Sequence, residues 1–171
     1  AVTATPSGRC YHCKNTLFRQ ILRAAENDGV PLLLDGTNAS DDAGDRPGMR
    51  ALRELSVRSP LRECGLTKAE IRRLSREAGL FTWDKPAYAC LSTRIRTGEE
   101  ITLQKLKQTE KAEGFLFGLG FRDFRVRMVD NTAKLELRET DLPLLLENRE
   151  KIVTELRKDY DSVLLNLEVR K

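Results

Sequence analysis

The sequence has few aromatic residues and no long apolar run. Aromatic residues make up 6% of the 171 residues, whereas charged residues make up 33%. Apolar runs such as residues 30–34 are far shorter than the ~20 residues that a membrane-spanning helix needs. The first residues also show no charged and apolar secretion signal. We therefore expect a protein of ordinary globular composition in a reducing, cytoplasmic compartment, with no membrane partner.

The sequence also lacks a strong excess of charge of one sign. Its 30 basic and 26 acidic residues give a net charge of +4 and a pI near 9.0. This balance favours anionic ligands only mildly. No block of Lys and Arg with interleaved aromatic residues is present, so nucleic-acid binding is not required.

Cysteine is scarce but patterned. Cys10 and Cys13 form a Cys-x-x-Cys pair, and Cys64 and Cys90 stand alone. Without a secretion signal, this pattern indicates metal or redox chemistry rather than a disulfide framework.

Cys90 lies between the stretch 82–88 and two arginines, Arg94 and Arg96. A thiol near guanidinium groups ionises more easily, and the thiolate is the nucleophile and the metal ligand. The alternative is that Cys90 is a small buried apolar residue.

The first half of the chain has an α/β pattern. Apolar spacing predicts a helix over 14–27, and the all-apolar run 30–34 is typical of a strand buried in a parallel sheet. A short helix over 49–55 and a second short strand over 57–61 follow. Thr67 and Glu70 form a capping-box pattern that predicts a helix to about residue 78.

A polar loop follows the first predicted strand. It contains Gly36, Thr37, Asn38, Asp41 and Arg46. Ligands of parallel sheets bind beyond the carboxyl ends of the strands, so Asp41 could hold magnesium and Arg46 a phosphate. Lys68, in the first turn of the helix after Thr67, marks a second candidate anion site. An exposed surface loop explains the same residues equally well.

The second half of the chain changes character. It predicts a helix over 103–118, a β-hairpin over 124–137, a helix over 142–158 and a strand over 163–169. We place a domain boundary near residues 96–100. Residues 1–96 would form part of a parallel-stranded α/β domain, and residues 97–171 a smaller α+β domain with an antiparallel sheet.

One face of the predicted hairpin is polar. It carries the residues Arg125, Arg127, Lys134, Glu136 and Arg138. Antiparallel sheets often expose such a face to water, with charge pairs across the strands. The alternative is an anion-binding surface.

Several motifs occur in an order that resembles a known family. They are Arg9-Cys10-Tyr11-x-Cys13-Lys14, Asp35-Gly36-Thr37-Asn38, Asp45-Arg46-Pro47-Gly48, Ser59-Pro60-Leu61, Leu66-Thr67-Lys68, and Trp83-Asp84-Lys85-Pro86 leading to Cys90-Leu91 and Arg94. Together they resemble the ATP-dependent sacrificial sulfur transferases of the LarE family, within the PP-loop ATP pyrophosphatases. The generic part is also similar to NAD synthetases, GMP synthetases and tRNA thiolases. The family's Ser-Gly-Gly-x-Asp-Ser phosphate loop is absent, so we expect a fragment of a longer protein that cannot activate ATP alone.

The resemblance implies a chemistry and a set of site residues. A carboxylate of pyridinium-3,5-biscarboxylic acid mononucleotide would be adenylated with ATP and magnesium and then converted into a thiocarboxylate, in biosynthesis of the nickel-pincer nucleotide cofactor. The resemblance places Cys90 at the sulfur-bearing position. It assigns Arg94, Arg125 and Arg127 to the substrate, with Glu136 and Asp141 near the same site. It also implies a homo-oligomer.

Family members differ in their sulfur source. Some give up the sulfur of the cysteine at the Cys90 position, whereas others hold a [4Fe-4S] cluster on three cysteines. The resemblance therefore implies a cluster on Cys10, Cys13 and Cys90, with Cys64 structural. Zinc is the alternative metal. Two other functions remain open: a tRNA thiolation enzyme of the PP-loop class, and a zinc-stabilised binding module using Cys10, His12, Cys13 or Cys64.

Overall fold

The protein divides into two compact units. The structure is a computed structural model that describes residues 8–30, 32–41 and 47–170. The first unit comprises residues Ala1–Lys85 and the second Pro86–Lys171. The division falls earlier in the chain than the expected boundary at residue 96, so the Cys90 segment packs with the second unit. Among the described residues, no helix has the length and apolar character needed to cross a membrane.

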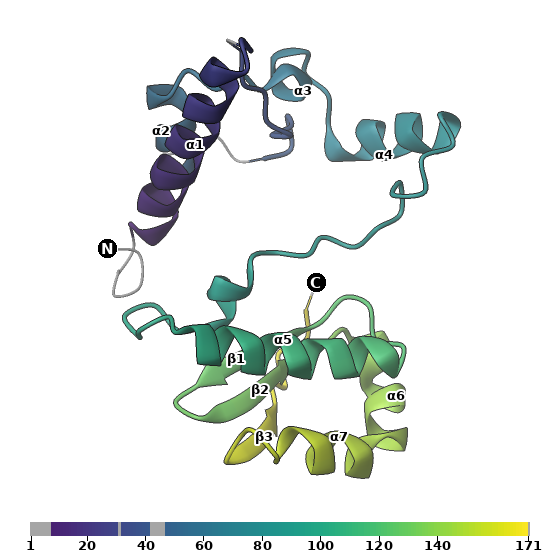
Figure 1. Ribbon diagram of the computed structural model, residues 1–171. Helices are drawn as coiled ribbons and strands as arrows, with labels where there is room; N and C mark the ends of the chain where they lie inside the picture. Colours follow the sequence, from purple (N-terminus) through teal and green to yellow (C-terminus); the bar gives the residue numbers. More distant parts are fainter. Residues whose placement is uncertain (1–7, 31, 42–46, 171) are drawn as a thin grey trace. The chain divides into compact units, whose positions relative to one another are not determined.

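The first unit consists mainly of helices (Figure 1). Helix α1, Arg9–Asn27, confirms the predicted helix but begins earlier, so that Cys10 and Cys13 lie in its first turns. It ends where Gly29 takes a positive φ of 72°, a conformation that glycine adopts without steric cost. Helix α2, Pro47–Glu54, packs against α1, and Tyr11 of α1 donates a hydrogen bond to Glu54.

Two further helices complete the first unit. Helix α3 spans Pro60–Glu63, and α4 spans Lys68–Glu77. The capping box predicted for α4 is confirmed: the Glu70 amide donates to Thr67 Oγ1 at 3.3 Å, and the Thr67 amide donates to Glu70 Oε2 at 2.8 Å. Both bonds satisfy backbone N–H groups that the helix itself leaves without an acceptor.

The two strands predicted in this unit do not form as such. The described residues of 30–34 and 57–61 meet in one parallel bridge, Leu34 to Arg58, and residues 60–61 belong to helix α3. Val30, Leu32 and Leu34 are each about half exposed. A strand buried on both faces needs neighbouring strands and covering helices, which the described residues do not supply. The expected parallel-stranded domain is therefore not formed in the described part of the chain.

The second unit is an α+β module (Figure 1). It contains the short 3₁₀ helix η1, Leu91–Arg94, followed by helix α5, Leu103–Gly118. Thr102 caps α5 by accepting a hydrogen bond from the Lys105 amide at 3.2 Å. Strands β1, Arg125–Val129, and β2, Thr132–Glu136, pair antiparallel and confirm the predicted hairpin.

The last part of the chain corrects two expectations. The single helix expected over 142–158 is two helices, α6 (Leu142–Glu147) and α7 (Arg149–Leu156), after the short 3₁₀ helix η2 (Glu139–Asp141). Strand β3, Ser162–Leu165, pairs parallel with β2, so the sheet of order β1-β2-β3 is mixed rather than antiparallel. The helical connection between β2 and β3 explains this, because a helical crossover returns the chain in the same direction.

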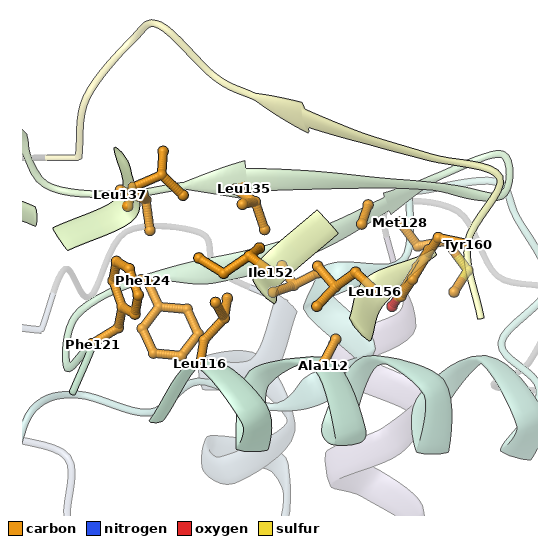
Figure 2. Packing of buried hydrophobic residues seen from close by; sticks show 13 residues of the cluster. Ala112, Leu116, Phe121, Phe124, Met128, Leu135, Leu137, Ile152, Leu156 and Tyr160 are labelled. Carbon is orange, nitrogen blue, oxygen red and sulfur yellow. The ribbon is translucent and has the colours of Figure 1, made fainter. Parts of the chain in front are cut away.

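One face of the sheet is covered by α5 and α7 (Figure 2). The sheet contributes Val126, Met128, Ala133 and Leu135, and the helices contribute Ala112, Leu116, Ile152 and Leu156. Each of these side chains is at most 5% exposed. Burial of one such aliphatic side chain stabilises a fold by roughly 1.5–3 kcal/mol. This core leaves the opposite, polar face of the sheet and the outer edge of β1 available to the Cys90 segment.

Candidate functional site

Cys90 is exposed at the start of the η1 turn. Its carbonyl accepts hydrogen bonds from the Thr93 amide at 2.9 Å and from Thr93 Oγ1 at 2.7 Å. Its Sγ atom lies 3.1 Å from Ser92 Oγ. The backbone at Cys90 is therefore fixed by its own turn, while the thiol remains accessible.

The segment after the turn runs along the outer edge of β1. Ile95, which is 1% exposed, forms a parallel bridge with Met128. Because β1 is an edge strand, this bridge satisfies backbone groups that would otherwise be unpaired. The Cys90 turn is thus attached directly to the sheet.

Arg127 and Arg125 hold the backbone on both sides of Cys90. Arg127 Nη1 donates to the Thr93 carbonyl at 2.7 Å, and Arg127 Nε donates to Glu136 at 2.6 Å. Arg125 Nη2 donates to the Ala87 carbonyl at 2.9 Å. The two arginines expected to bind substrate therefore also brace the thiol-bearing segment.

These two arginines differ in exposure. The Arg127 side chain is 42% exposed, whereas that of Arg125 is 8% exposed. Burial lowers the pKa of Arg125, and the positive charges of Arg94 and Arg170 lower it further. Arg127 is consequently the more accessible of the two for an external anion.

Arg94 lies inside the unit rather than on its surface. Its guanidinium pairs with Glu113 of α5, and both side chains are 1% exposed. Tyr88 covers the guanidinium, with 5.4 Å between Arg94 Cζ and the ring centroid. Burial, followed by its interaction with Glu113, raises the pKa of Tyr88 to about 12. Sequence reasoning placed Arg94 near Cys90 but missed Glu113, whose helical position gives no sign of a partner.

A second group of charged residues surrounds Arg127. Glu136 accepts from Arg127 and lies 3.8 Å from Arg170 Nη1. Arg170 Nη2 also pairs with Asp123 at 3.3 Å. Arg170 is a member of this group that the sequence pattern missed, because only folding brings the residues after β3 beside the end of β2, where the Arg170 amide donates to the Leu137 carbonyl at 2.8 Å.

Asp141, the last residue of η2, pairs with Arg138. It was expected to cap the following helix, but its side chain makes no capping bond and accepts instead from Arg138 at 3.2 and 3.3 Å. The hydrogen bonds and the charge of Asp141 raise the pKa of Arg138.

In the first unit, a pocket of about 330 Å³ gathers several predicted residues. Its lining consists of Cys10, Lys14, Thr37, Asp41, Pro47, Gly48 and Met49. Thr37 and Asp41 were predicted to contact nucleotide or magnesium, and Cys10 to bind metal. Lys14 places a positive charge in the same pocket, which suits an anionic group such as a phosphate. Lys14 is a residue that sequence reasoning did not assign.

Asp35 organises the loop that contains Thr37 by accepting three hydrogen bonds. Its carboxylate accepts from Ser59 Oγ at 2.6 Å, from Thr37 Oγ1 at 2.5 Å and from the Thr37 amide at 3.2 Å. Burial acts to raise the pKa of Asp35, but these hydrogen bonds outweigh it and lower that pKa below its ordinary value. The ionised carboxylate of Asp35 thus fixes the orientation of Thr37.

The other predicted nucleotide residues that the structure describes belong to this loop or contact it. The Asn38 amide donates to Asp41 Oδ2 at 2.9 Å, and the Lys68 amide donates to Ser40 Oγ at 3.0 Å. The loop therefore contacts the start of α4, where the Lys68 side chain is exposed. A side chain at Gly36 would meet no other atom within 4 Å. Arg46 lies outside the described residues.

Cys10 and Cys13 suit two metal ligands. Both are free, exposed and three positions apart on α1, so they share one helix face. Among the residues that the structure describes, no group of three or more His, Cys, Asp or Glu side chains could hold a metal ion. Within the described ranges, the pair therefore offers two sulfur ligands without completing a metal site.

Comparison with known proteins gives similar chains. No protein-family model matches. An uncharacterised protein of Synechocystis sp. is 44% identical over 135 residues, which cover 79% of this chain and 50% of that protein. An uncharacterised protein of Methanocaldococcus jannaschii is 34% identical over 163 residues, covering 94% of this chain and 63% of that protein.

A third relative carries a functional name. The pyridinium-3,5-bisthiocarboxylic acid mononucleotide synthase of Lactiplantibacillus plantarum is 35% identical over 129 residues, covering 75% of this chain and 47% of the synthase. The chain is similar to this synthase. The match supports the LarE-like resemblance that the motifs indicate. The chain spans only 47% to 63% of the length of these relatives.

Proposed function

We propose that the full-length protein is an ATP-dependent sulfurtransferase that converts a carboxylate of pyridinium-3,5-biscarboxylic acid mononucleotide into a thiocarboxylate, for the nickel-pincer nucleotide cofactor. The observation that carries this proposal is the 35% identity to the synthase over 129 residues. Cys90 supports the proposal because its thiol is exposed and because Arg127 donates a hydrogen bond to the carbonyl of Thr93, in the same turn.

The proposed reaction begins with activation. A carboxylate is a poor electrophile, so a carboxylate oxygen of the substrate attacks the α-phosphorus of magnesium-bound ATP and releases pyrophosphate. Lys14, Thr37 and Asp41 line one pocket of the first unit and are proposed to contact the phosphates and magnesium. The neighbouring Gly36, Asn38 and Lys68 complete this proposed set, together with Arg46.

Sulfur transfer follows in the proposed sequence. The Cys90 thiolate attacks the acyl carbon of the adenylate, and AMP leaves with the bonding electrons of its oxygen. Loss of the Cys90 α-proton and cleavage of its Cβ–S bond then leave the thiocarboxylate and dehydroalanine. Arg127 and Arg125 are proposed to hold the substrate phosphate. Glu136, which pairs with Arg127, and Asp141, which pairs with Arg138, are proposed to orient these arginines. Arg94 is not included in this set, because its guanidinium is buried against Glu113.

The three-cysteine pattern favours a second source of the sulfur, which Cys10, Cys13 and Cys90 are proposed to hold. A [4Fe-4S] cluster on these three thiolates would supply an open iron that binds an extra sulfide for transfer. The two thiolates on α1 fit this role, and the third belongs to the second unit. The protein would then turn over repeatedly. From the resemblance, we also propose that it forms a homo-oligomer.

The experiment uses the full-length protein with ATP, magnesium and the pyridinium substrate. We expect pyrophosphate and AMP to appear and the product mass to show one oxygen replaced by sulfur. A Cys90→Ala variant should still release pyrophosphate but form no thiocarboxylate, while a Cys64→Ala variant serves as the control. Thiocarboxylate formation by Cys90→Ala, or no product from the wild-type protein, would refute the proposal.

A further inference from the structure

Glu113 and Arg94 form a buried, two-point ion pair. Arg94 Nε donates to Glu113 Oε1 at 2.7 Å, and Arg94 Nη2 donates to Glu113 Oε2 at 3.0 Å. Both side chains are 1% exposed. Two parallel hydrogen bonds fix the planes of both groups, so this pair determines direction as well as distance.

The pair links three elements. Glu113 belongs to α5, and its Oε1 also accepts from the Val126 amide of β1 at 3.0 Å. Arg94 is the last residue of η1, the turn that follows Cys90. One carboxylate therefore ties the end of the Cys90 turn to a core helix and to the edge strand.

A chain of hydrogen bonds continues from this pair to Cys90. Arg94 Nη1 donates to Thr93 Oγ1 at 2.9 Å, and Thr93 Oγ1 donates to the Cys90 carbonyl at 2.7 Å. Every link is short and lies within the second unit. Displacement of the Arg94 guanidinium would thus be passed to the backbone that carries the thiol.

Stability alone explains this pair poorly. Removing two charges from water is costly, and a buried ion pair can often be replaced by apolar side chains of similar volume without loss of stability. If the pair instead sets the position of η1, apolar replacement of both residues should preserve the fold but make the η1 turn more mobile.

We propose that Glu113 and Arg94 are positioning residues that hold the Cys90 thiol in one orientation for attack. This inference deepens the proposed function and rests on the role of Cys90 as the sulfur-transferring thiol. Neither residue contacts the reacting atoms. Their contribution is to remove conformational freedom from the turn before substrate arrives, which lowers the barrier to a correctly oriented attack.

The test compares three variants of the full-length protein. Arg94→Met with Glu113→Leu replaces the pair by apolar side chains, whereas Glu113→Gln keeps the shape but leaves the Arg94 charge uncompensated. Glu110→Gln, an exposed position one turn earlier on α5, is the matched control. Thermal unfolding, peptide-resolved hydrogen exchange and the kinetics of sulfur transfer are measured for each.

In the double variant we expect a melting temperature close to that of the wild type and amides of residues 91–95 that exchange about tenfold faster, the equivalent of one lost hydrogen bond. The rate constant of sulfur transfer should fall by a similar factor, while the substrate concentration that gives half of the maximal rate is unchanged. Glu113→Gln should show the same faster exchange together with a lower melting temperature.

Unchanged exchange at residues 91–95 in the stable double variant would overturn the positioning role. Faster exchange with wild-type turnover would overturn it as well, because the turn would then be free without consequence. The hydrogen-exchange result does not depend on sulfur chemistry. Sulfur transfer by Cys90→Ala would instead refute the proposed function, so the two failures are distinguishable.

Discussion

At the scale of single residues, Asp35 shows how an acidic side chain can organise a loop. Its carboxylate accepts hydrogen bonds from Ser59 and Thr37, which come from separate parts of the first unit. These bonds favour the ionised form and lower the pKa of Asp35 from its ordinary value of 3.8. Ionisation of Asp35 is therefore coupled to folding of this loop.

The sign of this coupling gives a pH prediction. A carboxylate whose pKa is lower in the folded than in the unfolded state stabilises the fold above the unfolded-state value. That contribution is lost as pH falls below the ordinary value of 3.8 and through the folded-state pKa. We expect Asp35→Asn to lose less stability between pH 7 and about pH 3 than the wild type does.

Thermal unfolding of both proteins across this pH range provides the measurement. Asp28→Asn, an exposed acidic position at the end of α1, is the control and should follow the wild type. Parallel curves for wild type and Asp35→Asn would mean that the Ser59 and Thr37 bonds do not favour the ionised form.

At the scale of elements, strand β1 places two arginines in different settings. Arg125 is buried and donates to the carbonyls of Phe124 and Ala87. Arg127 is half exposed and pairs with Glu136. Arg125 is thus held mainly by backbone carbonyls, whereas Arg127 offers more of its side chain to an external anion.

This contrast predicts different effects for the two alanine variants. Arg125→Ala should destabilise the protein by about 1–3 kcal/mol, because it removes the hydrogen bonds that Arg125 donates to the carbonyls of Phe124 and Ala87. Arg127→Ala should cost less than about 1 kcal/mol of stability, as half-exposed ion pairs contribute little. It should nevertheless weaken binding of the pyridinium mononucleotide on the order of tenfold.

Calorimetric binding and thermal unfolding measure the two effects separately. Arg149→Ala removes an exposed arginine from α7 and serves as the charge control. Equal losses of stability and affinity in Arg127→Ala would indicate a structural role for this residue, and unaltered affinity would remove it from the substrate site.

Elements with local signals were predictable from the sequence. The capped helices α4 and α5 and the β1–β2 hairpin contain their own stop signals and periodicity. The run 30–34 carried no such signal, since an apolar run specifies burial but not the partners that provide it. The parallel pairing of β3 follows from the helical connection between β2 and β3, and the break at Asn148 that divides α6 from α7 had no clear signal in the apolar pattern.

The candidate site was predictable to a similar extent. Cys90, Arg125 and Arg127 were singled out from motif and alternation, and in the structure the two arginines of β1 donate to backbone carbonyls on either side of Cys90. Glu113 could not be predicted, because a glutamate on a helix is usually exposed. Only the approach of η1 to α5 turns it into the buried partner of Arg94.

At the scale of the whole molecule, the cysteines are divided between the two units. Cys10 and Cys13 lie on α1 in the first unit, and Cys90 lies before η1 in the second. A [4Fe-4S] cluster on these three residues is part of the proposed function of the full-length protein.

Anaerobic reconstitution with iron and sulfide tests this arrangement in the full-length protein. We expect about four irons per chain and visible absorbance from a bound [4Fe-4S] cluster. Cys10→Ala and Cys13→Ala should each lose most of this iron, because two remaining thiolates hold a cluster poorly. Cys64→Ala, which changes an exposed cysteine of α3's C-terminus, should retain the iron of the wild type.

Two outcomes would redirect the mechanism. Full iron content and repeated turnover in Cys10→Ala would exclude the three-thiolate cluster. Loss of one sulfur from the Cys90 peptide after a single turnover would show that the protein sacrifices its own thiol. In that case turnover would stop at one product per chain, and iron bound at Cys10 and Cys13 would have no part in sulfur transfer. Zinc retained in place of iron, with no absorbance, would assign the Cys10 and Cys13 pair a structural role, because such thiolate pairs bind either metal.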